Sequence, residues 1–217
     1  MLYTVYTPVA LRTPHVKGVV QCKCSSNTYE RYLWFWPSVC SRRRCSVPRR
    51  RPHHPLPASQ KDSLPPNLTA SYLTAPDANG RRQKKEVTLS DFKGQKNVVL
   101  AFFPAAFSPG CTSEMAKYQE TSGQFNTNNT VILGISVDSP WANAAFTEKL
   151  GVQFPILSDA KRDISRAYGV FDEQNVIARR TTFVIDREGI VQHVFMAQEA
   201  LDPTHALEVC ALLKEVK

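Results

Sequence analysis

Residues 97–114 read NVVLAFFPAAFSPGCTSE. The first seven of them form a continuous apolar run of strand length, which predicts a strand covered on both faces. A Pro-Gly pair then leads into a helix predicted over 111–125, so Cys111 lies in the first turn of that helix. The unpaired N–H groups and the positive dipole end of a first turn favour the thiolate form of a cysteine. Cys111 is therefore a candidate nucleophile. The alternative, a small core residue, is less favoured because open α/β sheets place their ligands at the carboxyl ends of central strands.

The rest of the chain after this stretch alternates short apolar runs with amphipathic segments. Further strands are predicted at 131–137, 154–157, 182–186 and 190–195, and helices at 140–150, at 159–168 and from 202 onwards. In the second of these helices Asp159 is the expected N-cap, with Ile164, Ala167 and Tyr168 facing inward. Crossovers followed by a final hairpin predict an α/β domain with a central mixed sheet and helices on both faces.

The charge of the chain is divided unevenly. The whole chain has 217 residues and a net charge of +8, but residues 1–61 carry 11 Lys and Arg against one acid, Glu30. The remainder is slightly acidic. We predict a basic, Pro/Arg-rich, disordered extension over 1–65 and a folded domain over 66–217. The extension is open to three interpretations: an organellar transit peptide, an arm for nucleic acid or an anionic surface, or an inert or misassigned extension of the reading frame.

The cysteines are divided in the same way. Four of the six lie in the front segment, and only Cys111 and Cys210 lie beyond it. Two cysteines in a domain of this size do not make a disulfide framework, which suits a reducing compartment or a thiol kept for chemistry. We expect a cytoplasmic protein, or an organellar one if residues 1–65 act as a transit peptide.

Neither a metal, a cofactor nor a membrane is expected as a partner. The front cysteines, together with His53 and His54, lack the usual zinc-finger spacings. The aromatic run at 32–36 ends at Pro37 and is far too short to span a bilayer.

The turn at 104–111 resembles the peroxiredoxins, the alkyl hydroperoxide reductase/thiol-specific antioxidant group of thioredoxin-like proteins. Their hallmark, Pro-x-x-x-(Thr/Ser)-x-x-Cys, is matched by Pro104, Ser108 and Cys111. The resemblance covers about residues 75–217. It departs from the family at 68–74, where an Ala-Pro-Asp-Phe-like segment is usual, and this leaves open whether the family's first strand is altered or absent here.

The resemblance implies a role for each matching residue. Cys111 would be the peroxidatic nucleophile that becomes a sulfenic acid, and Ser108 would orient the peroxide. Pro104 would shield the thiolate from water. Arg180 would hold the thiolate and polarise the peroxide oxygens, because a guanidinium offers several fixed donors. Glu114 would help to position that arginine.

The choice between Arg179 and Arg180 depends on strand geometry. Neighbouring residues of a strand point to opposite faces, so only one of the two can reach the pocket. The family's Arg-x-x-Phe spacing selects Arg180. Trp141 matches an aromatic that is frequent near the family's pocket or subunit contact, and a core role is the alternative.

The sulfenic acid needs a reductant, and the resemblance offers two positions for a resolving cysteine. The resolving cysteine of the helical-pair type would stand at Ala116. Cys210 follows Val209 as in the C-terminal type, but its helical stripe predicts a core position. Whether Cys210 acts as a resolving thiol is therefore left open. The default is a one-cysteine cycle, in which an external thiol such as thioredoxin, glutaredoxin or a low-molecular-weight thiol reduces the sulfenic acid.

The leading hypothesis is a thiol-dependent peroxidase that reduces hydrogen peroxide and alkyl hydroperoxides in antioxidant defence and redox homeostasis. Its expected partners are the peroxide, a thioredoxin-like or low-molecular-weight thiol and a second copy in a homodimer; nucleic acid is not expected to bind. The alternative is a thioredoxin-like redox sensor or binding module without turnover. A disulfide reductase is disfavoured because no Cys-x-x-Cys occurs.

Overall fold

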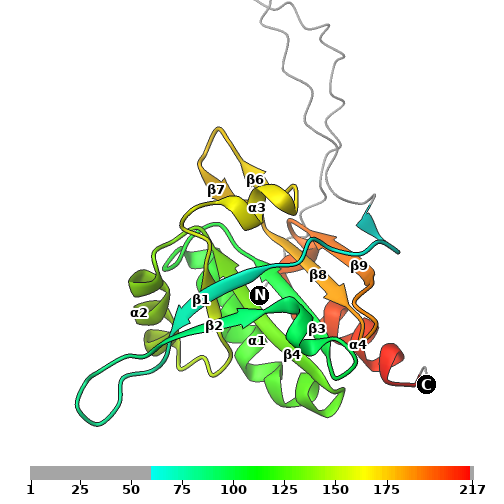
Figure 1. Cartoon of the computed structure of the whole chain (residues 1–217), viewed down its shortest axis with the longest axis horizontal. Helices are drawn as coiled ribbons and strands as arrows, with labels where there is room; N and C mark the ends of the chain where they lie inside the picture. Colours follow the sequence, from blue (N-terminus) through cyan, green and yellow to red (C-terminus); the bar gives the residue numbers. More distant parts are fainter. Residues whose placement is uncertain (1–59, 216–217) are drawn as a thin grey trace, which may run out of the picture. The chain divides into compact units, whose positions relative to one another are not determined.

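A seven-stranded mixed sheet runs through the part of the chain that the computed structural model describes, residues 60–215 (Figure 1). The strands lie in the order β2-β1-β5-β4-β3-β8-β9. Their bounds are β1 Thr69–Leu73, β2 Lys84–Thr88, β3 Asn97–Phe102, β4 Thr130–Ser136, β5 Ile156–Ser158, β8 Thr181–Ile185 and β9 Val191–Met196. The central strands β3, β4 and β5 pair in parallel, and all other pairs are antiparallel.

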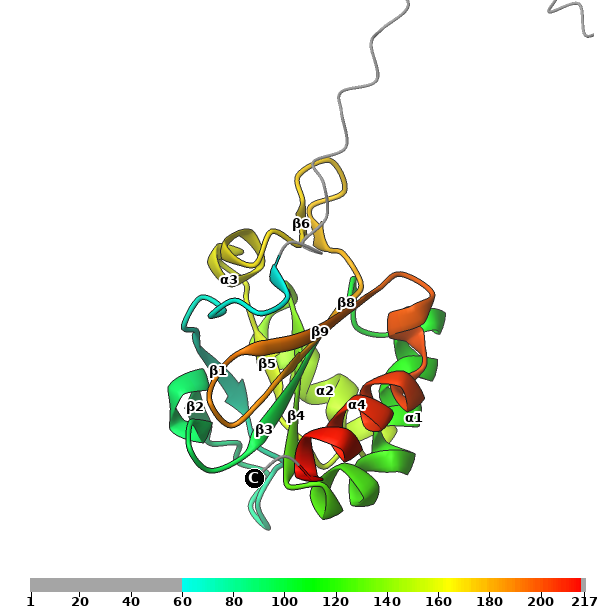
Figure 2. The same cartoon turned by 90° about the vertical axis from the view of Figure 1, so that its right-hand side faces the viewer.

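Helices cover both faces of this sheet, as predicted. One face packs against α1 Pro109–Thr127, α2 Pro140–Leu150 and α4 Pro203–Glu215. The other face is covered by the short α3 Asp163–Ala167 and the 3-10 turn η2 Leu89–Phe92. Figure 2 shows α1 and α4 on the opposite side of the sheet from α3.

The apolar run at 97–103 is explained by these two layers. Val99, Ala101 and Phe103 belong to the core under α1 and α4, whereas Val98, Leu100 and Phe102 belong to the core on the other face. Because both faces of this strand are covered, residues 98–103 are all apolar and carry no alternation; the polar residue at its start, Asn97, is also buried.

Most helix ends lie where their local signals predict. α1 begins at Pro109 with Ser108 as N-cap, and α2 ends at Gly151 in the left-handed conformation with φ 64°. α4 begins at Pro203, and the Asp202 carboxylate accepts a hydrogen bond from the Thr204 N–H at 3.1 Å.

The helix predicted over 159–168 is shorter than expected. It begins only at Asp163, and its N-cap is Arg162, in the left-handed conformation with φ 65°. The Arg162 N–H donates a hydrogen bond to the Asp159 carbonyl at 2.7 Å and closes a turn, so the helix begins only after this turn. Asp159 still acts as a cap from a distance, because its carboxylate accepts the Ser165 N–H at 2.7 Å. The prediction that Ala167 faces inward is wrong, since that residue is exposed.

Two features of the sheet were not predicted from the sequence. The first strand, left open above, is present as β1 and pairs with β2 from Thr69 opposite Thr88 onwards. A two-stranded ribbon, β6 Phe171–Asp172 with β7 Ile177–Ala178, connects α3 to β8. Strands of two residues are too short to show any periodicity.

Residues 60–65, which the sequence assigned to the extension, contact the domain. The Asp62 N–H donates to the Val191 carbonyl at 2.7 Å, and the Val191 N–H donates to the Ser63 carbonyl at 3.0 Å. The boundary at residue 65 and the character of the extension stay predictions, because residues 1–59 lie outside the described part. Within residues 60–215 no helix is both long and apolar enough to cross a bilayer.

Candidate active site

Cys111 and Arg180 meet at the carboxyl end of β3. The sulfur of Cys111 lies in the first turn of α1 and is fully buried. Nη2 of Arg180 donates to this Sγ at 3.3 Å. The sheet register explains the contact: Phe102 at the end of β3 lies opposite Thr181 at the start of β8, so the residue before Thr181 lies beside the loop that follows β3.

Glu114 completes the cluster from the next turn of the same helix. Residues three apart share one face of a helix, so Glu114 and Cys111 point the same way. The Glu114 side chain has no exposed surface, and its Oε2 is ion-paired with Nη1 of Arg180. The guanidinium therefore bridges a carboxylate and a sulfur with its two terminal nitrogens. The planar fork of the guanidinium makes this bridge possible. A lysine ammonium, which is a single point charge, could not reproduce it.

Gly110 makes room for this arginine. A Cβ atom at position 110 would lie 3.2 Å from Nη2 of Arg180. The Pro-Gly pair thus does more than begin the helix, because the glycine lets the guanidinium approach the first turn closely.

Pro104 and Ser108 lie on the loop between β3 and α1, and both are partly buried. Ser108 is the N-cap residue in extended conformation, and its carbonyl accepts the Thr112 N–H at 2.9 Å. Its hydroxyl does not cap the helix. The structure thus brings Cys111, Glu114 and Arg180 into contact, with Pro104 and Ser108 on the loop that enters the same helix.

Asp138 is a loop-holding residue that the sequence reasoning missed. Its Oδ2 accepts the Ala106 N–H at 2.8 Å, and this ties the loop before Cys111 to the end of β4. The rule that ligand sites lie at the carboxyl ends of parallel strands could have indicated it, since Asp138 follows a strand next to β3.

Known proteins resemble the chain in both sequence and fold. Residues 72–194 match the AhpC/TSA family. The chain belongs to this family. Alkyl hydroperoxide reductase E of Mycobacterium tuberculosis is 41% identical over 128 residues, which cover 58% of this chain and 84% of the relative.

Solved structures of peroxiredoxins share the fold. The reduced 2-Cys peroxiredoxin of Plasmodium vivax superimposes with a TM-score of 0.63 at 26% identity, covering 71% of this chain and 96% of that one. A peroxidoxin from Mycobacterium tuberculosis gives 0.58 at 28% identity, with 73% and 98% covered. These likenesses confirm the predicted thioredoxin-like α/β fold and the peroxiredoxin resemblance. The protein is a thiol-dependent peroxidase, an antioxidant oxidoreductase that acts on a peroxide and uses a thiol reductant.

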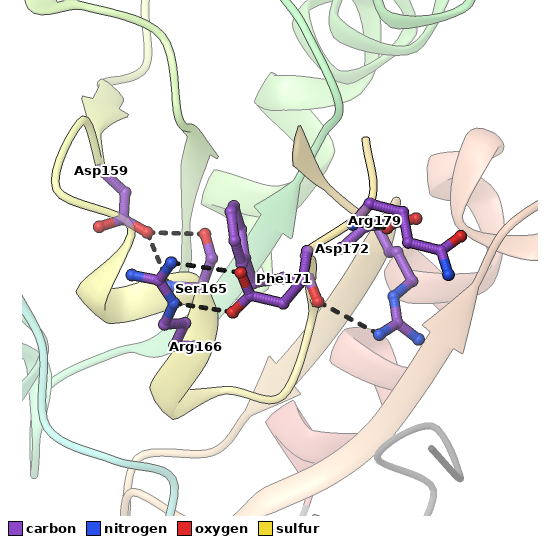
Figure 3. A network of polar contacts seen from close by, with 8 residues as sticks. Asp159, Ser165, Arg166, Phe171, Asp172 and Arg179 are labelled. Atoms are coloured by element: carbon purple, nitrogen blue, oxygen red, sulfur yellow. Dashed lines mark hydrogen bonds and ion pairs between the residues drawn. The ribbon is translucent and has the colours of Figure 1, made fainter. Parts of the chain in front are cut away.

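In this peroxiredoxin Arg179 points away from the cluster. Its Nη2 donates to the Phe171 carbonyl at 3.2 Å. Figure 3 shows Arg179 directed at the backbone of the β6–β7 ribbon, in a network that also contains Arg166. The Arg166 guanidinium lies 4.6 Å from the centroid of the Phe171 ring and pairs with Glu173 at 3.0 Å. The two neighbouring arginines lie in the connection between β7 and β8, outside both strands, and their side chains have different partners: Arg180 contacts the sulfur and Arg179 contacts the ribbon. The strand alternation used to predict this separation therefore does not apply to them.

Two aromatic side chains near this end of the peroxiredoxin are exposed. Trp141, in the first turn of α2, is 69% exposed, so the core role considered for it is wrong. Phe107, in the loop before Cys111, is 50% exposed and lies 5.2 Å, centroid to centroid, from the ring of Phe146.

Cys210 lies in the core on α4 and has no exposed surface. Burial raises the pKa of its thiol to about 11. The side chain is therefore protonated at neutral pH, which favours the core interpretation over a resolving role. No group of three or more His, Cys, Asp or Glu side chains within residues 60–215 could hold a metal ion. The front cysteines considered as ligands lie outside the described residues.

Proposed function

We propose that Cys111 is the peroxidatic nucleophile of this peroxidase. The observation that carries the proposal is the contact of a buried sulfur with Arg180 Nη2 at 3.3 Å, while the other end of that guanidinium is paired with the buried carboxylate of Glu114. A positive group held at this distance stabilises a thiolate. The N–H groups of the first helical turn act in the same direction.

The first half of the reaction is the attack of the Cys111 thiolate on one oxygen of a hydroperoxide. The S–O bond forms as the O–O bond breaks, and the sulfur is oxidised to a sulfenic acid. The departing oxygen leaves as an alkoxide or hydroxide and takes a proton to give an alcohol or water. Charge therefore moves from sulfur to the leaving oxygen, and Arg180 is placed to stabilise it at both ends of this path.

The loop residues have supporting roles in this proposal. The Ser108 hydroxyl, which does not cap its own helix, is free to donate to the peroxide. We assign to Pro104, which is partly buried on the loop before Cys111, the role of keeping water away from the sulfur. Glu114 fixes the orientation of Arg180 and does not touch the substrate.

The second half returns the sulfur to the thiol. A first external thiol displaces water from the Cys111 sulfenic acid and forms a mixed disulfide, and a second thiol reduces that disulfide and releases Cys111. We assign the reductant to a thioredoxin-like protein or a low-molecular-weight thiol. The protonated, buried state of Cys210 supports this one-cysteine cycle.

Hydrogen peroxide and alkyl hydroperoxides are the proposed substrates, since the cluster addresses only the O–O group that they share. The related mycobacterial protein is named an alkyl hydroperoxide reductase. A homodimer is proposed from the exposure of Trp141 and Phe107, because large apolar side chains left in water favour an interface.

We also propose a cytoplasmic location, with an organellar one as the alternative if residues 1–65 act as a transit peptide. The N-terminal sequence of protein purified from its native source distinguishes the two, since an organellar import signal would be absent from the mature chain.

The decisive experiment compares the wild type with Cys111→Ser and Cys210→Ser. Wild type and Cys210→Ser are expected to consume hydrogen peroxide equally fast, and Cys111→Ser is expected to be inactive. A sulfenic-acid trapping reagent, mapped by mass spectrometry, should label Cys111 alone. Equal peroxide consumption by wild type and Cys111→Ser would refute the assignment. Labelling of Cys111 without turnover by any thiol reductant would instead favour the sensor alternative.

A further inference from the structure

A cavity of about 310 Å³ lies at the opposite end of the sheet from Cys111. It is formed by residues 64–67, by η2 with the segment that follows it, and by the ends of β3 and β8. Its floor is apolar and buried: Leu89, Val98 and Ile185 are 8%, 1% and 1% exposed. Leu64 stands at the mouth with 72% of its surface in water. Such an apolar hollow with a few polar groups at its rim has the character of a small-molecule site.

The rim of the cavity carries positive charge. Lys93 and Lys96 both line it, both are exposed, and neither is ion-paired with any acid within residues 60–215. The stem of Lys93 lies across the β8–β9 turn, where its Cδ would be 3.8 Å from a Cβ atom at Gly189. The stem of Lys93 therefore lies beside the β8–β9 turn, at the edge of the cavity.

The one acid of the lining does not neutralise these lysines. Asp186 is 8% exposed, and its two carboxylate oxygens accept the Ile190 N–H at 2.8 Å and the Gln192 side-chain amide at 2.5 Å. Both oxygens are therefore hydrogen-bonded by neutral groups, and the lining keeps a net charge of +1 from two lysines against one aspartate. The cavity combines an apolar floor with two cations that have no partner in the described part of the chain.

We propose that this cavity binds a medium-chain amphipathic carboxylate. The alkyl chain would lie on Leu89, Val98 and Ile185, and the carboxylate would meet Lys93 and Lys96. At about 30 Å³ for each water-sized group, the volume suits a molecule of about ten heavy atoms. The chain's own front segment is a poor occupant, because residues 1–61 carry strong positive charge and would be repelled by the rim.

The cavity is separate from the peroxidase site and the proposal does not depend on it. Val98 pairs with Ile185 at one end of β3 and β8, whereas Phe102 pairs with Thr181 at the other, beside Arg180. The two pairs are four residue steps apart along the strand, roughly 13 Å. The carboxylate is therefore a second ligand and not the peroxide substrate, and Cys111→Ser should bind it as the wild type does.

The test uses the reduced full-length protein and decanoate, well below its micelle concentration, in isothermal titration calorimetry. Saturable binding of one decanoate per chain is expected. Lys93→Gln and Lys96→Gln should each weaken it about threefold, and the double variant about tenfold, as loss of exposed charge pairs does. Decanol, which has the same chain without the charge, should bind about tenfold more weakly. The matched control is Lys84→Gln with Lys85→Gln, two exposed lysines of β2 that do not line the cavity, and it should bind as the wild type does.

A cavity-filling variant separates the apolar floor from the charges. Ser90 is exposed and lines the cavity, so Ser90→Phe should block decanoate while melting temperature and peroxide consumption stay as in the wild type. Absence of saturable binding, equal loss in the control lysine variant, or undiminished binding to Ser90→Phe would overturn the proposal. So would binding to phosphatidylglycerol vesicles that needs Lys93 and Lys96 but is not competed by decanoate, which would assign the lysines to a membrane surface.

Discussion

Replacing Arg180 by Met should slow the reaction with peroxide and also destabilise the fold, for two separable reasons. The guanidinium lies 3.3 Å from the Cys111 sulfur, where a unit charge pair in an effective dielectric of about 20 has a gross attraction of about 5 kcal/mol. Loss of one such preorganised donor typically costs about 3–4 kcal/mol of transition-state stabilisation. We therefore expect the second-order rate constant for peroxide to fall by about 10²- to 10³-fold.

The effect on stability comes from the partner that is left behind. Glu114 has no exposed surface, so without Arg180 its carboxylate would be an unpaired buried charge. Breaking a buried pair in this way costs about 3–5 kcal/mol of the free energy of unfolding. The double variant Arg180→Met/Glu114→Gln removes both charges, and it should recover most of the stability without recovering the rate.

The assay is stopped-flow competition for hydrogen peroxide, combined with urea unfolding of the same variants. Arg179→Met is the matched control, because this neighbouring arginine contacts the Phe171 carbonyl instead of the sulfur. Its rate constant should stay within about threefold of the wild type. The reasoning is refuted if Arg180→Met reacts as fast as Arg179→Met, or if the double variant regains the rate together with the stability.

Further substitutions at three positions probe the loop and the core. Gly110→Ala should lower the peroxide rate constant about tenfold at little cost in melting temperature, because its Cβ would lie 3.2 Å from Arg180 Nη2; an unchanged rate would mean that the guanidinium moves aside freely. Asp138→Ala should lower the free energy of unfolding in urea by about 1–2 kcal/mol and slow the reaction several-fold, since the Ala106 N–H loses its acceptor. Asp138→Asn keeps an acceptor and should restore most of both. Burial raises the pKa of the Cys210 thiol to about 11 in the folded protein, whereas the thiol of the unfolded chain ionises at about pH 8.5. The stability that the protonated Cys210 contributes is therefore complete below about pH 8.5 and is lost as pH rises towards about 11. Urea unfolding of Cys210→Ala should lack this component, and an identical decline in both proteins would contradict it.

Several structural elements of this peroxiredoxin can be predicted from the local sequence. The run at 97–103 predicts β3 because both faces of that strand are covered. Gly151 marks the end of α2 because only a residue that accepts positive φ readily can close a helix in this way. Cys111 could be placed at a helix start for the same kind of reason, since the Pro-Gly pair before it fixes the chain locally.

Other parts were misjudged or left open from the sequence, because they depend on turn geometry or on packing that local signals do not show. Asp159 carries the chemistry of a helix cap, yet an intervening turn moves the start of α3 to Asp163. β1 forms because it pairs with β2 and β5, and the intrinsic strand propensity of its own residues does not decide this. Trp141 is a large aromatic in an amphipathic helix, but the packing of α2 leaves it in water.

The active site shows the same division. The sequence by itself determined which residue types are present: a cysteine at a helix start, an acid one turn later and two adjacent arginines, of which the family's Arg-x-x-Phe spacing selects Arg180. The tertiary structure decided how Arg180 reaches Cys111, 69 positions away in the chain, because the antiparallel register of β3 and β8 brings the two residues together. It also decided that Asp138 holds the loop, and it confirmed the core position that the helical stripe predicts for Cys210. Local propensities act over a few residues, whereas a distance between two side chains on different strands is fixed only when the whole sheet has paired.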